Sequence, residues 1–283
     1  MAIKNVFVIG AGTMGNGIAQ VSAQAGYNVT MSDIKDEFLE KGMATIEKSL
    51  DRMVKKETIQ ESEKTTIMSR IRTTVNLKDA AGADLVIEAA PEELALKISI
   101  FKQLDETCKE EAILATNTSS LPVGAIAAAT GRPDRVIGIH FMNPVPVMKG
   151  VEVIPGRHTA DDVLEASKEY IKSIGKEPCE ARDYAGFIVS RLVDAIMNEA
   201  FWCVMDGNKP EEVDKAVKLC LNHPMGPLEL CDLAGADVVL HGLETMYAEF
   251  GERLMPAPLL RNMVRSGDLG RKTGKGFYDY TQK

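Results

Sequence analysis

Residues 6–15 read VFVIGAGTMG, and they indicate which fold the first part of the chain adopts. Residues 6–9 are an unbroken apolar run, which is typical of a buried parallel strand. A helix is predicted directly after the run, because apolar residues recur on one helical face as far as Ala25, and Gly26 can end that helix. Residues 29–31 then return to strand character. The stretch therefore predicts a strand-helix-strand unit, the building block of a parallel sheet covered by helices.

The glycines between the first strand and the helix predict a dinucleotide site. In Gly10-x-Gly12-x-x-Gly15 the first glycine permits a tight turn, the second lets a pyrophosphate approach the backbone, and the third allows close packing. Asp33 lies 18 residues beyond the last glycine, where its carboxylate can accept both ribose hydroxyl protons. Because that carboxylate would repel a 2′-phosphate, we expect NAD. The loop residues expected to contact the cofactor are Gly10, Ala11, Gly12, Thr13, Met14 and Gly15.

The alternation of strands and helices continues through the first two thirds of the chain. It predicts an α/β domain with a mainly parallel sheet. A charged helix is expected at 36–56 and a helix after residue 93. Further strands are expected around Val75 and at 83–87, 112–115, 135–140 and 151–154.

Beyond Tyr184 the strand signal disappears, so we expect a first domain at 1–183 and a helical second domain at 184–283. Apolar residues between 188 and 201 occupy most positions around a helix. Such a pattern predicts a helix that is buried on most of its circumference. The rows that give this pattern are Ile188, Leu192, Ile196 and Ala200, and Val189, Val193, Met197 and Phe201.

The composition narrows the class of protein. Of 283 residues, 45% are hydrophobic, which is enough for a packed core. There are 33 Lys+Arg against 41 Asp+Glu, a formal charge of −8 that argues against a general nucleic-acid binder. The five cysteines form no C-x-x-C pair, so we expect reduced thiols and a cytoplasmic protein. No signal peptide and no apolar run of about 18 residues is recognised, so no membrane span is expected.

His140 and Glu152 form a candidate catalytic pair. His140 ends a predicted strand, where open α/β sheets place ligands, and Glu152 lies on the strand that returns after the turn at 143–146. A hairpin-like return of this length can bring the carboxylate against the imidazole. Oxidation of an alcohol beside a nicotinamide needs a base for the hydroxyl proton and a partner for the imidazolium. The spacing of the two residues alone is also compatible with a pair that has only a structural role.

Several motifs along nearly the whole chain resemble those of the 3-hydroxyacyl-CoA dehydrogenases, most closely the short bacterial 3-hydroxybutyryl-CoA dehydrogenases. They are GAGTMG (10–15), IEAA (87–90), TNTSSL (116–121), HFMNPV (140–145), NHPMGP (222–227) and GRKTGKGF (270–277). The resemblance implies hydride transfer between NAD and C3 of a 3-hydroxyacyl thioester. It also implies a Rossmann-type, mainly parallel sheet domain, an all-helical C-terminal dimerisation domain, an active site between them, and a homodimer.

By motif position, the resemblance implies a role for each candidate catalytic residue. His140 would be the general base and Glu152 its orienting partner. Ser119 would hydrogen-bond the substrate oxygen and approach the nicotinamide, and Asn143 would help to place cofactor and substrate. Without the resemblance, Ser119 would be interpreted as a helix cap and Asn143 as a turn residue.

The resemblance also implies further cofactor contacts and shows one departure. Glu92, Lys97 and Lys272 match positions that contact the cofactor in the family. Ser190, in GFIVSR at 186–191, stands where the family usually carries an Asn that helps to bind the thioester. Serine loses the reach of the amide and one hydrogen-bonding group. We therefore expect transition-state stabilisation about 1–3 kcal/mol weaker than with Asn.

A basic stripe lies on the charged helix. Lys48, Arg52, Lys55 and Lys56 share one helical face, which would attract the 3′-phosphate and diphosphate of coenzyme A. A solvated face is the alternative, because acidic residues are interleaved with the stripe. The resemblance favours coenzyme A binding through Ser49 and Lys56.

The expected function is that of an NAD-dependent (S)-3-hydroxyacyl-CoA dehydrogenase. It would interconvert acetoacetyl-CoA and (S)-3-hydroxybutyryl-CoA in short-chain fatty acid or butyrate metabolism, with no metal. One alternative is a 3-hydroxy-acid dehydrogenase that acts on a free sugar acid or carboxylate, which would not need the basic stripe. The other is a non-enzymatic NAD-binding structural protein, and the presence of both His140 and Glu152 speaks against it.

Overall fold

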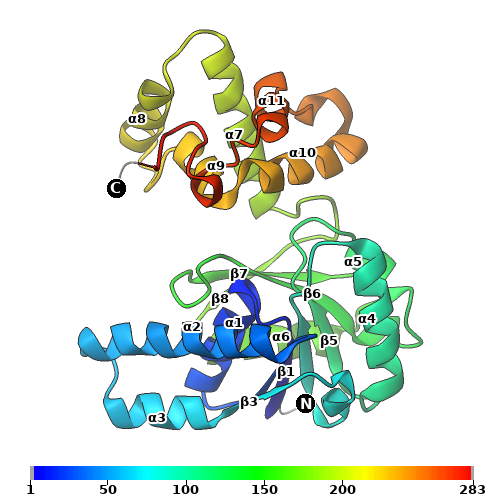
Figure 1. The fold of residues 1–283 in the computed structure, drawn as a ribbon. Coiled ribbons are helices and arrows are strands. Elements are labelled where there is room, and N and C mark those ends of the chain that lie inside the picture. The colour runs from blue at the N-terminus through cyan, green and yellow to red at the C-terminus, as the bar shows by residue number, and fades with distance from the viewer. Residues whose placement is uncertain (1–2, 282–283) are drawn as a thin grey trace. The chain divides into compact units, whose positions relative to one another are not determined.

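The computed structural model describes residues 3–281, and the chain forms two compact units, Met1–Asp183 (unit 1) and Tyr184–Lys283 (unit 2). Unit 1 is an α/β unit and unit 2 is helical, so the predicted fold class is confirmed (Figure 1). None of the helices within 3–281 has the length and apolar character needed to cross a membrane.

Within the described part of unit 1, eight strands form a single sheet in the order β3-β2-β1-β4-β5-β6-β7-β8. Strands β1 to β6 are mutually parallel, β7 is antiparallel to β6, and β8 is parallel to β7. The chain order reverses between β1 and β4, and doubly wound sheets bind ligands beyond the carboxyl ends of the strands at such a reversal. The strands are β1 (Asn5–Ile9), β2 (Asn28–Ser32), β3 (Ile71–Thr74), β4 (Leu85–Glu88), β5 (Ile113–Thr116), β6 (Val136–Phe141), β7 (Gly150–Pro155) and β8 (Glu177–Glu180).

Helices cover both faces of this sheet. One face, which includes Val6 and Val8, packs against α1, α2 and α6 in a single hydrophobic cluster. On the other face Val123 of α5 lies against Gly138 of β6. Because both faces are buried, the central strands are continuous apolar runs instead of alternating ones. The helices are α1 (Thr13–Gln24), α2 (Asp36–Lys55), α3 (Glu61–Ser69), α4 (Leu94–Thr107), α5 (Val123–Ala127) and α6 (Asp161–Ser173), with the 3-10 turns η1 (Leu77–Gly82) and η2 (Pro133–Arg135).

The predicted strand-helix-strand unit at the N-terminus is confirmed as β1, α1 and β2. Gly26 follows the end of α1 with a φ of +99°, a left-handed conformation that glycine adopts without steric cost. The strand predicted around Val75 is displaced, because β3 ends at Thr74 and Val75 is 51% exposed just beyond it. β3 and β8 are the two edges of the sheet and carry few apolar side chains, so their sequences give a weak strand signal.

Unit 2 is a small helical bundle with its own core. Met197 and Phe201 of α7 pack with Leu243 and Met246 of α10 in the hydrophobic cluster of this unit. Its helices within 184–281 are α7 (Val189–Met205), α8 (Pro210–Cys220), α9 (Pro227–Ala234), α10 (Ala236–Phe250) and α11 (Pro258–Ser266), with the 3-10 turns η3 (Gly251–Leu254) and η4 (Arg271–Thr273).

The prediction that α7 is buried on most of its circumference is wrong. Ile188, Leu192 and Ile196 form a row that is 45%, 59% and 40% exposed. The rest of unit 2 packs against the opposite face, which carries Met197 and Phe201. Both faces of α7 are apolar in the sequence, but the described residues of unit 2 cover only one of them.

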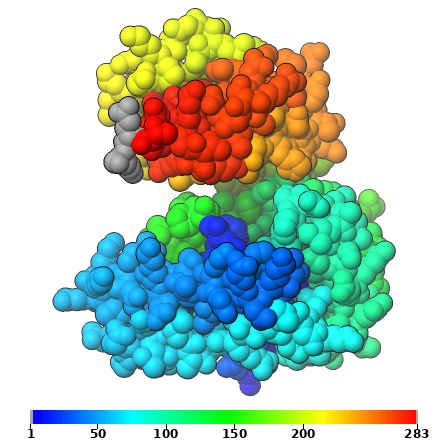
Figure 2. Space-filling model, viewed as in Figure 1, coloured from blue at the N-terminus to red at the C-terminus, as the bar shows by residue number. Residues whose placement is uncertain are grey.

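The two C-terminal sequence motifs have structural roles in unit 2. A Cβ atom at Gly226 would lie 2.2 Å from Cγ of Asp214, and one at Gly276 would lie 2.0 Å from Oδ1 of Asp232. Asp232 accepts hydrogen bonds from the backbone N–H groups of Phe277 and Tyr278, at 3.0 Å each. The C-terminal segment, red in Figure 2, is thereby held against the helical unit. These glycines are needed because a buried carboxylate occupies the space of a side chain.

Candidate active site

The glycine loop between β1 and α1 has the geometry of a phosphate site. A Cβ atom at Gly15 would lie 1.7 Å from the carbonyl oxygen of Gly10, so only glycine lets the helix start this close to the strand. Gly10 has a φ of +96°. A Cβ atom at Gly12 would meet no atom within 4 Å, so this backbone faces open space. The N-terminus of α1 therefore offers its backbone N–H groups to an anion without a side chain in the way.

Asp33 follows the end of β2, as predicted, and borders the same space. Its Oδ2 accepts a hydrogen bond from the backbone N–H of Ala11 at 2.7 Å, and its Oδ1 accepts one from the N–H of Ile34. These bonds hold the carboxylate at the edge of a cavity of about 990 Å³. The cavity lining includes the glycine loop, Asp33, Phe38 and Val75. A dinucleotide fits this site, because phosphate donors, a ribose-binding carboxylate and apolar walls for a base follow one another along it.

His140 and Glu152 form the pair that the sequence predicts. They are register partners on the antiparallel strands β6 and β7, and Nδ1 of His140 lies 2.8 Å from Oε2 of Glu152. The histidine is 8% exposed and the glutamate 1%. Because a carboxylate only accepts, the imidazole proton lies on Nδ1 and Nε2 is the basic nitrogen. The pair can therefore take up a proton at Nε2 and stabilise the resulting imidazolium.

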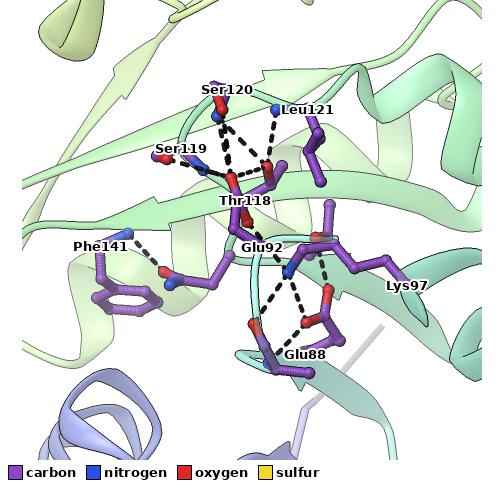
Figure 3. Close-up of polar contacts among 11 residues, drawn as sticks. Glu88, Glu92, Lys97, Thr118, Ser119, Ser120, Leu121 and Phe141 are labelled. Carbon is purple, nitrogen blue, oxygen red and sulfur yellow. Dashed lines mark hydrogen bonds and ion pairs between the residues drawn. The ribbon is translucent and has the colours of Figure 1, made fainter. Parts of the chain in front are cut away.

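Ser119 lies in the loop after β5, and Glu92 holds this loop in place (Figure 3). Oε1 of Glu92 accepts hydrogen bonds from the hydroxyl of Thr118 at 2.6 Å, from the N–H of Ser119 at 2.8 Å and from the hydroxyl of Ser119 at 3.1 Å. Burial alone would raise the pKa of Glu92, but the Lys97 ammonium and these bonds outweigh it and lower the pKa. An ionised Glu92 thus orients the hydroxyl of Ser119.

Lys97 and Glu88 form a buried ion pair behind this loop (Figure 3). The Lys97 ammonium lies 2.7 Å from Glu88, 3.4 Å from Glu92 and 3.3 Å from the carbonyl oxygen of Ala90. Both members of the pair are almost fully buried, with the lysine 1% and the glutamate 0% exposed. Lys97 therefore contacts Glu92, the residue that holds the loop of Ser119. Glu88 was not among the predicted site residues, although a carboxylate that ends an apolar strand is an available signal of such a pair.

Asn143 lies in the turn between β6 and β7, and its side chain is exposed. Phe141, the last residue of β6, donates its N–H to the side-chain oxygen of Asn117 at 2.9 Å. Asn117 is a second residue that sequence reasoning missed. It ties the end of β6 to the loop that carries Ser119, so the two loops that bear predicted catalytic groups are joined.

The basic stripe is exposed on α2 and just beyond its end. The interleaved acids Glu47 and Asp51 are instead paired with Lys64 of α3, at 3.5 Å and 2.5 Å. Within residues 3–281 none of Lys48, Arg52, Lys55 and Lys56 forms an ion pair with a carboxylate. Ser49 is half-buried on the same helix. The interleaved acids therefore do not neutralise the stripe, which favours an anionic ligand over a merely solvated face.

In unit 2, Ser190 and Lys272 are the predicted site residues. Ser190 is half-buried in the first turn of α7, and Lys272 pairs with Asp237 at 2.5 Å. Asp194, one helical turn after Ser190, is 9% exposed and accepts no hydrogen bond from any residue of the described chain. Burial raises the pKa of Asp194 to about 7. In 3–281 no group of three or more His, Cys, Asp or Glu residues could hold a metal ion.

Comparison with known proteins identifies the relatives of both units. Residues 5–184 match the NAD-binding domain of 3-hydroxyacyl-CoA dehydrogenase, and residues 186–280 match its C-terminal domain. A probable 3-hydroxybutyryl-CoA dehydrogenase of Deinococcus radiodurans is 47% identical over 275 residues, which are 96% of this chain and 99% of that protein. A 3-hydroxybutyryl-CoA dehydrogenase of Clostridioides difficile is 47% identical over 277 residues, 97% of this chain and 99% of that protein. The crystal structure of (S)-3-hydroxybutyryl-CoA dehydrogenase from Ralstonia eutropha is similar with a TM-score of 0.95 at 46% identity, covering 99% of this chain and 100% of that one.

Proposed function

The chain belongs to the 3-hydroxyacyl-CoA dehydrogenase family, and on that premise we propose that it interconverts acetoacetyl-CoA and (S)-3-hydroxybutyryl-CoA. The observation that carries this proposal is the buried pair of His140 and Glu152, at 2.8 Å, on the same sheet as the NAD-binding loop. The relatives from Deinococcus and Clostridioides are named for the four-carbon substrate. We assign the reaction to short-chain fatty acid or butyrate metabolism on the same ground.

The residues of unit 1 supply the acid-base part of the reaction. NAD, when bound, exchanges a hydride with C3 of the substrate. Nε2 of His140 removes the hydroxyl proton during oxidation and returns it during reduction, while Glu152 stabilises the imidazolium. The hydroxyl of Ser119 hydrogen-bonds the substrate oxygen. It accepts from the substrate hydroxyl while it donates to Glu92, and its single proton turns from Glu92 to the substrate when that oxygen is a ketone. Asn143 places cofactor and substrate, and Ser190 takes part in substrate binding.

The basic stripe favours a coenzyme A ester over a free acid. Its four cations on and next to α2 are exposed and the neighbouring acids are neutralised by Lys64. Such a surface attracts the 3′-phosphate and diphosphate of coenzyme A. A free hydroxy acid carries neither group, so we assign Ser49 and Lys56 to coenzyme A.

The exposed row on α7 supports the proposed homodimer. Ile188, Leu192 and Ile196 offer an apolar face on the helical unit, where the family resemblance places the contact between subunits. Leu192→Glu should convert a dimer into monomers in light scattering after gel filtration. Exposed Leu219→Glu on α8 is the matched control. A wild-type protein that is monomeric at micromolar concentration would contradict this assignment.

The reaction is tested by the oxidation of NADH with acetoacetyl-CoA. We expect turnover by the wild type and a loss of about 10²- to 10⁴-fold in kcat for His140→Gln, the usual contribution of a general base. Free acetoacetate should be a far poorer substrate, and NADPH a poorer cofactor than NADH. Equal kcat/KM for the free acid would support the free-acid dehydrogenase. No turnover with any substrate by a folded protein that binds NADH would support the non-enzymatic alternative.

A further inference from the structure

A buried lysine supports the turn that carries Asn143. Lys176 lies between α6 and β8 and is 6% exposed. Its ammonium group donates to the carbonyl oxygens of Val145 and Met148, at 2.6 Å each. No carboxylate within residues 3–281 pairs with it, and burial lowers the pKa of Lys176. A charged group kept in the interior without an ion-pair partner is costly, which indicates a specific use for its hydrogen bonds.

The turn between β6 and β7 makes few bonds of its own. The N–H groups of Val147 and Met148 both donate to the carbonyl oxygen of Pro144, at 3.0 Å each. The carbonyl oxygens of Val145 and Met148 instead converge on the ammonium of Lys176. Without the Lys176 ammonium, both carbonyl oxygens would lose this hydrogen-bond donor. The conformation of the turn therefore depends on a residue about 30 positions away in the chain.

The same turn also packs against the dinucleotide helix. A Cβ atom at Gly17 of α1 would lie only 2.8 Å from Cβ of Val145, and Val145 is 2% exposed. The turn is thus held by two contacts, one with α1 and one with Lys176. Because α1 begins at the phosphate-binding loop, these two contacts set the position of Asn143 relative to the pyrophosphate site.

We propose that Lys176 is a positioning residue, which fixes the turn at 142–149 against α1 so that Asn143 meets the nicotinamide end of the cofactor in a set position. This inference rests on the proposed function in one respect, the role given to Asn143. The stripe on α2 lies outside the contacts of this turn. Loss of Lys176 should therefore affect the cofactor and the chemical step but not the binding of coenzyme A.

The test compares Lys176→Met with Lys172→Met, which removes an exposed lysine from the end of α6. For Lys176→Met we expect kcat/KM for NADH to fall about 10- to 100-fold, because a small displacement of a positioning group costs this much. KM for acetoacetyl-CoA should stay within about twofold. The Kd of NADH, from its fluorescence, should rise as well. Lys172→Met should leave all three values unchanged.

Two further variants separate positioning from general stability. Gly17→Ala pushes the same turn through Val145 and should reproduce the cofactor effect with Lys176 intact. In an Asn143→Ala background, Lys176→Met should add little, because the lysine acts through that residue. Lower thermal stability of Lys176→Met with unchanged kcat, KM and Kd for NADH would overturn the inference, and so would full additivity with Asn143→Ala. If the wild type does not turn over acetoacetyl-CoA, the proposed function fails, while the effect of Lys176→Met on NADH binding still decides the inference.

Discussion

Replacing Asp194 by Asn should change how the stability of the helical unit depends on pH. Asp194 of α7 is 9% exposed. A Cβ atom at Gly242 of α10 would lie only 2.7 Å from Oδ2 of Asp194. The carboxyl group therefore fills the space left by a glycine between two helices, and no donor within 3–281 compensates a negative charge there. Burial raises its pKa from 3.8 to about 7.

The sign and size of the change in the free energy of unfolding follow from the linkage between protonation and folding. Because the folded pKa lies above the unfolded one, the free energy of unfolding is unaffected below pH 4 and falls as pH rises towards 7, where the loss levels off. At 1.36 kcal/mol for each pKa unit, the total loss is about 4 kcal/mol, of which about 3 kcal/mol falls between pH 5 and pH 8. Asparagine does not titrate. The free energy of unfolding of Asp194→Asn, relative to that of the wild type, should thus rise by about 3 kcal/mol from pH 5 to pH 8.

Urea unfolding followed by tryptophan fluorescence measures this difference directly. Trp202 is the single tryptophan of the chain and lies on α7, so its signal reports the helical unit. The exposed Asp206 at the end of α7 gives the matched control, and Asp206→Asn should follow the wild type at both pH values. A difference between Asp194→Asn and the wild type that is the same at pH 5 and pH 8 would refute the reasoning.

Three further outcomes test the candidate site and the packing of the C-terminal segment against Asp232. Ser190→Asn should raise kcat/KM for acetoacetyl-CoA by about 5- to 150-fold, the equivalent of 1–3 kcal/mol, and no gain would show that serine already serves the substrate. Lys56→Ala should raise KM for acetoacetyl-CoA about two- to fivefold and leave KM for NADH unchanged. The control Lys102→Ala, on the exposed side of α4, should leave both KM values unchanged. An unchanged KM for acetoacetyl-CoA in Lys56→Ala would remove that lysine from the coenzyme A site. Gly276→Ala should lower the free energy of unfolding by about 1–3 kcal/mol because the new Cβ would lie 2.0 Å from Oδ1 of Asp232, whereas Gly82→Ala, with open space around it, should not.

Much of unit 1 could be predicted from local pattern. The run of apolar residues before Gly10 and the glycine spacing after it indicate one strand-turn-helix unit, because few other conformations satisfy both. The pairing of His140 with Glu152 was also predictable, since a short antiparallel return brings residues of this separation into register. The edge strands β3 and β8 were harder to recognise, because a strand that is half solvated carries few apolar residues.

The candidate site was only partly predictable for a different reason. Glu92 and Lys97 were assigned by resemblance as cofactor contacts, but the structure shows what they contact in the protein itself. Glu92 binds the loop of Ser119, and Lys97 is enclosed by Glu88 and Glu92. The contacts of Glu92 with the loop of Ser119 join residues 26 to 28 positions apart in the chain. No periodicity in the sequence records them.

The order of strands and helices, the dinucleotide loop and the family could be recognised from the amino-acid pattern, because these depend on neighbouring residues and on glycines that no other residue can replace. The tertiary structure decided which charges are buried and what they support: Lys97 behind the serine loop, Lys176 beneath the turn of Asn143, and Asp194 between two helices of unit 2. It also decided that one apolar face of α7 stays exposed. The physical reason is that burial and hydrogen bonding depend on distances in space, and a single sequence specifies those distances only through the fold.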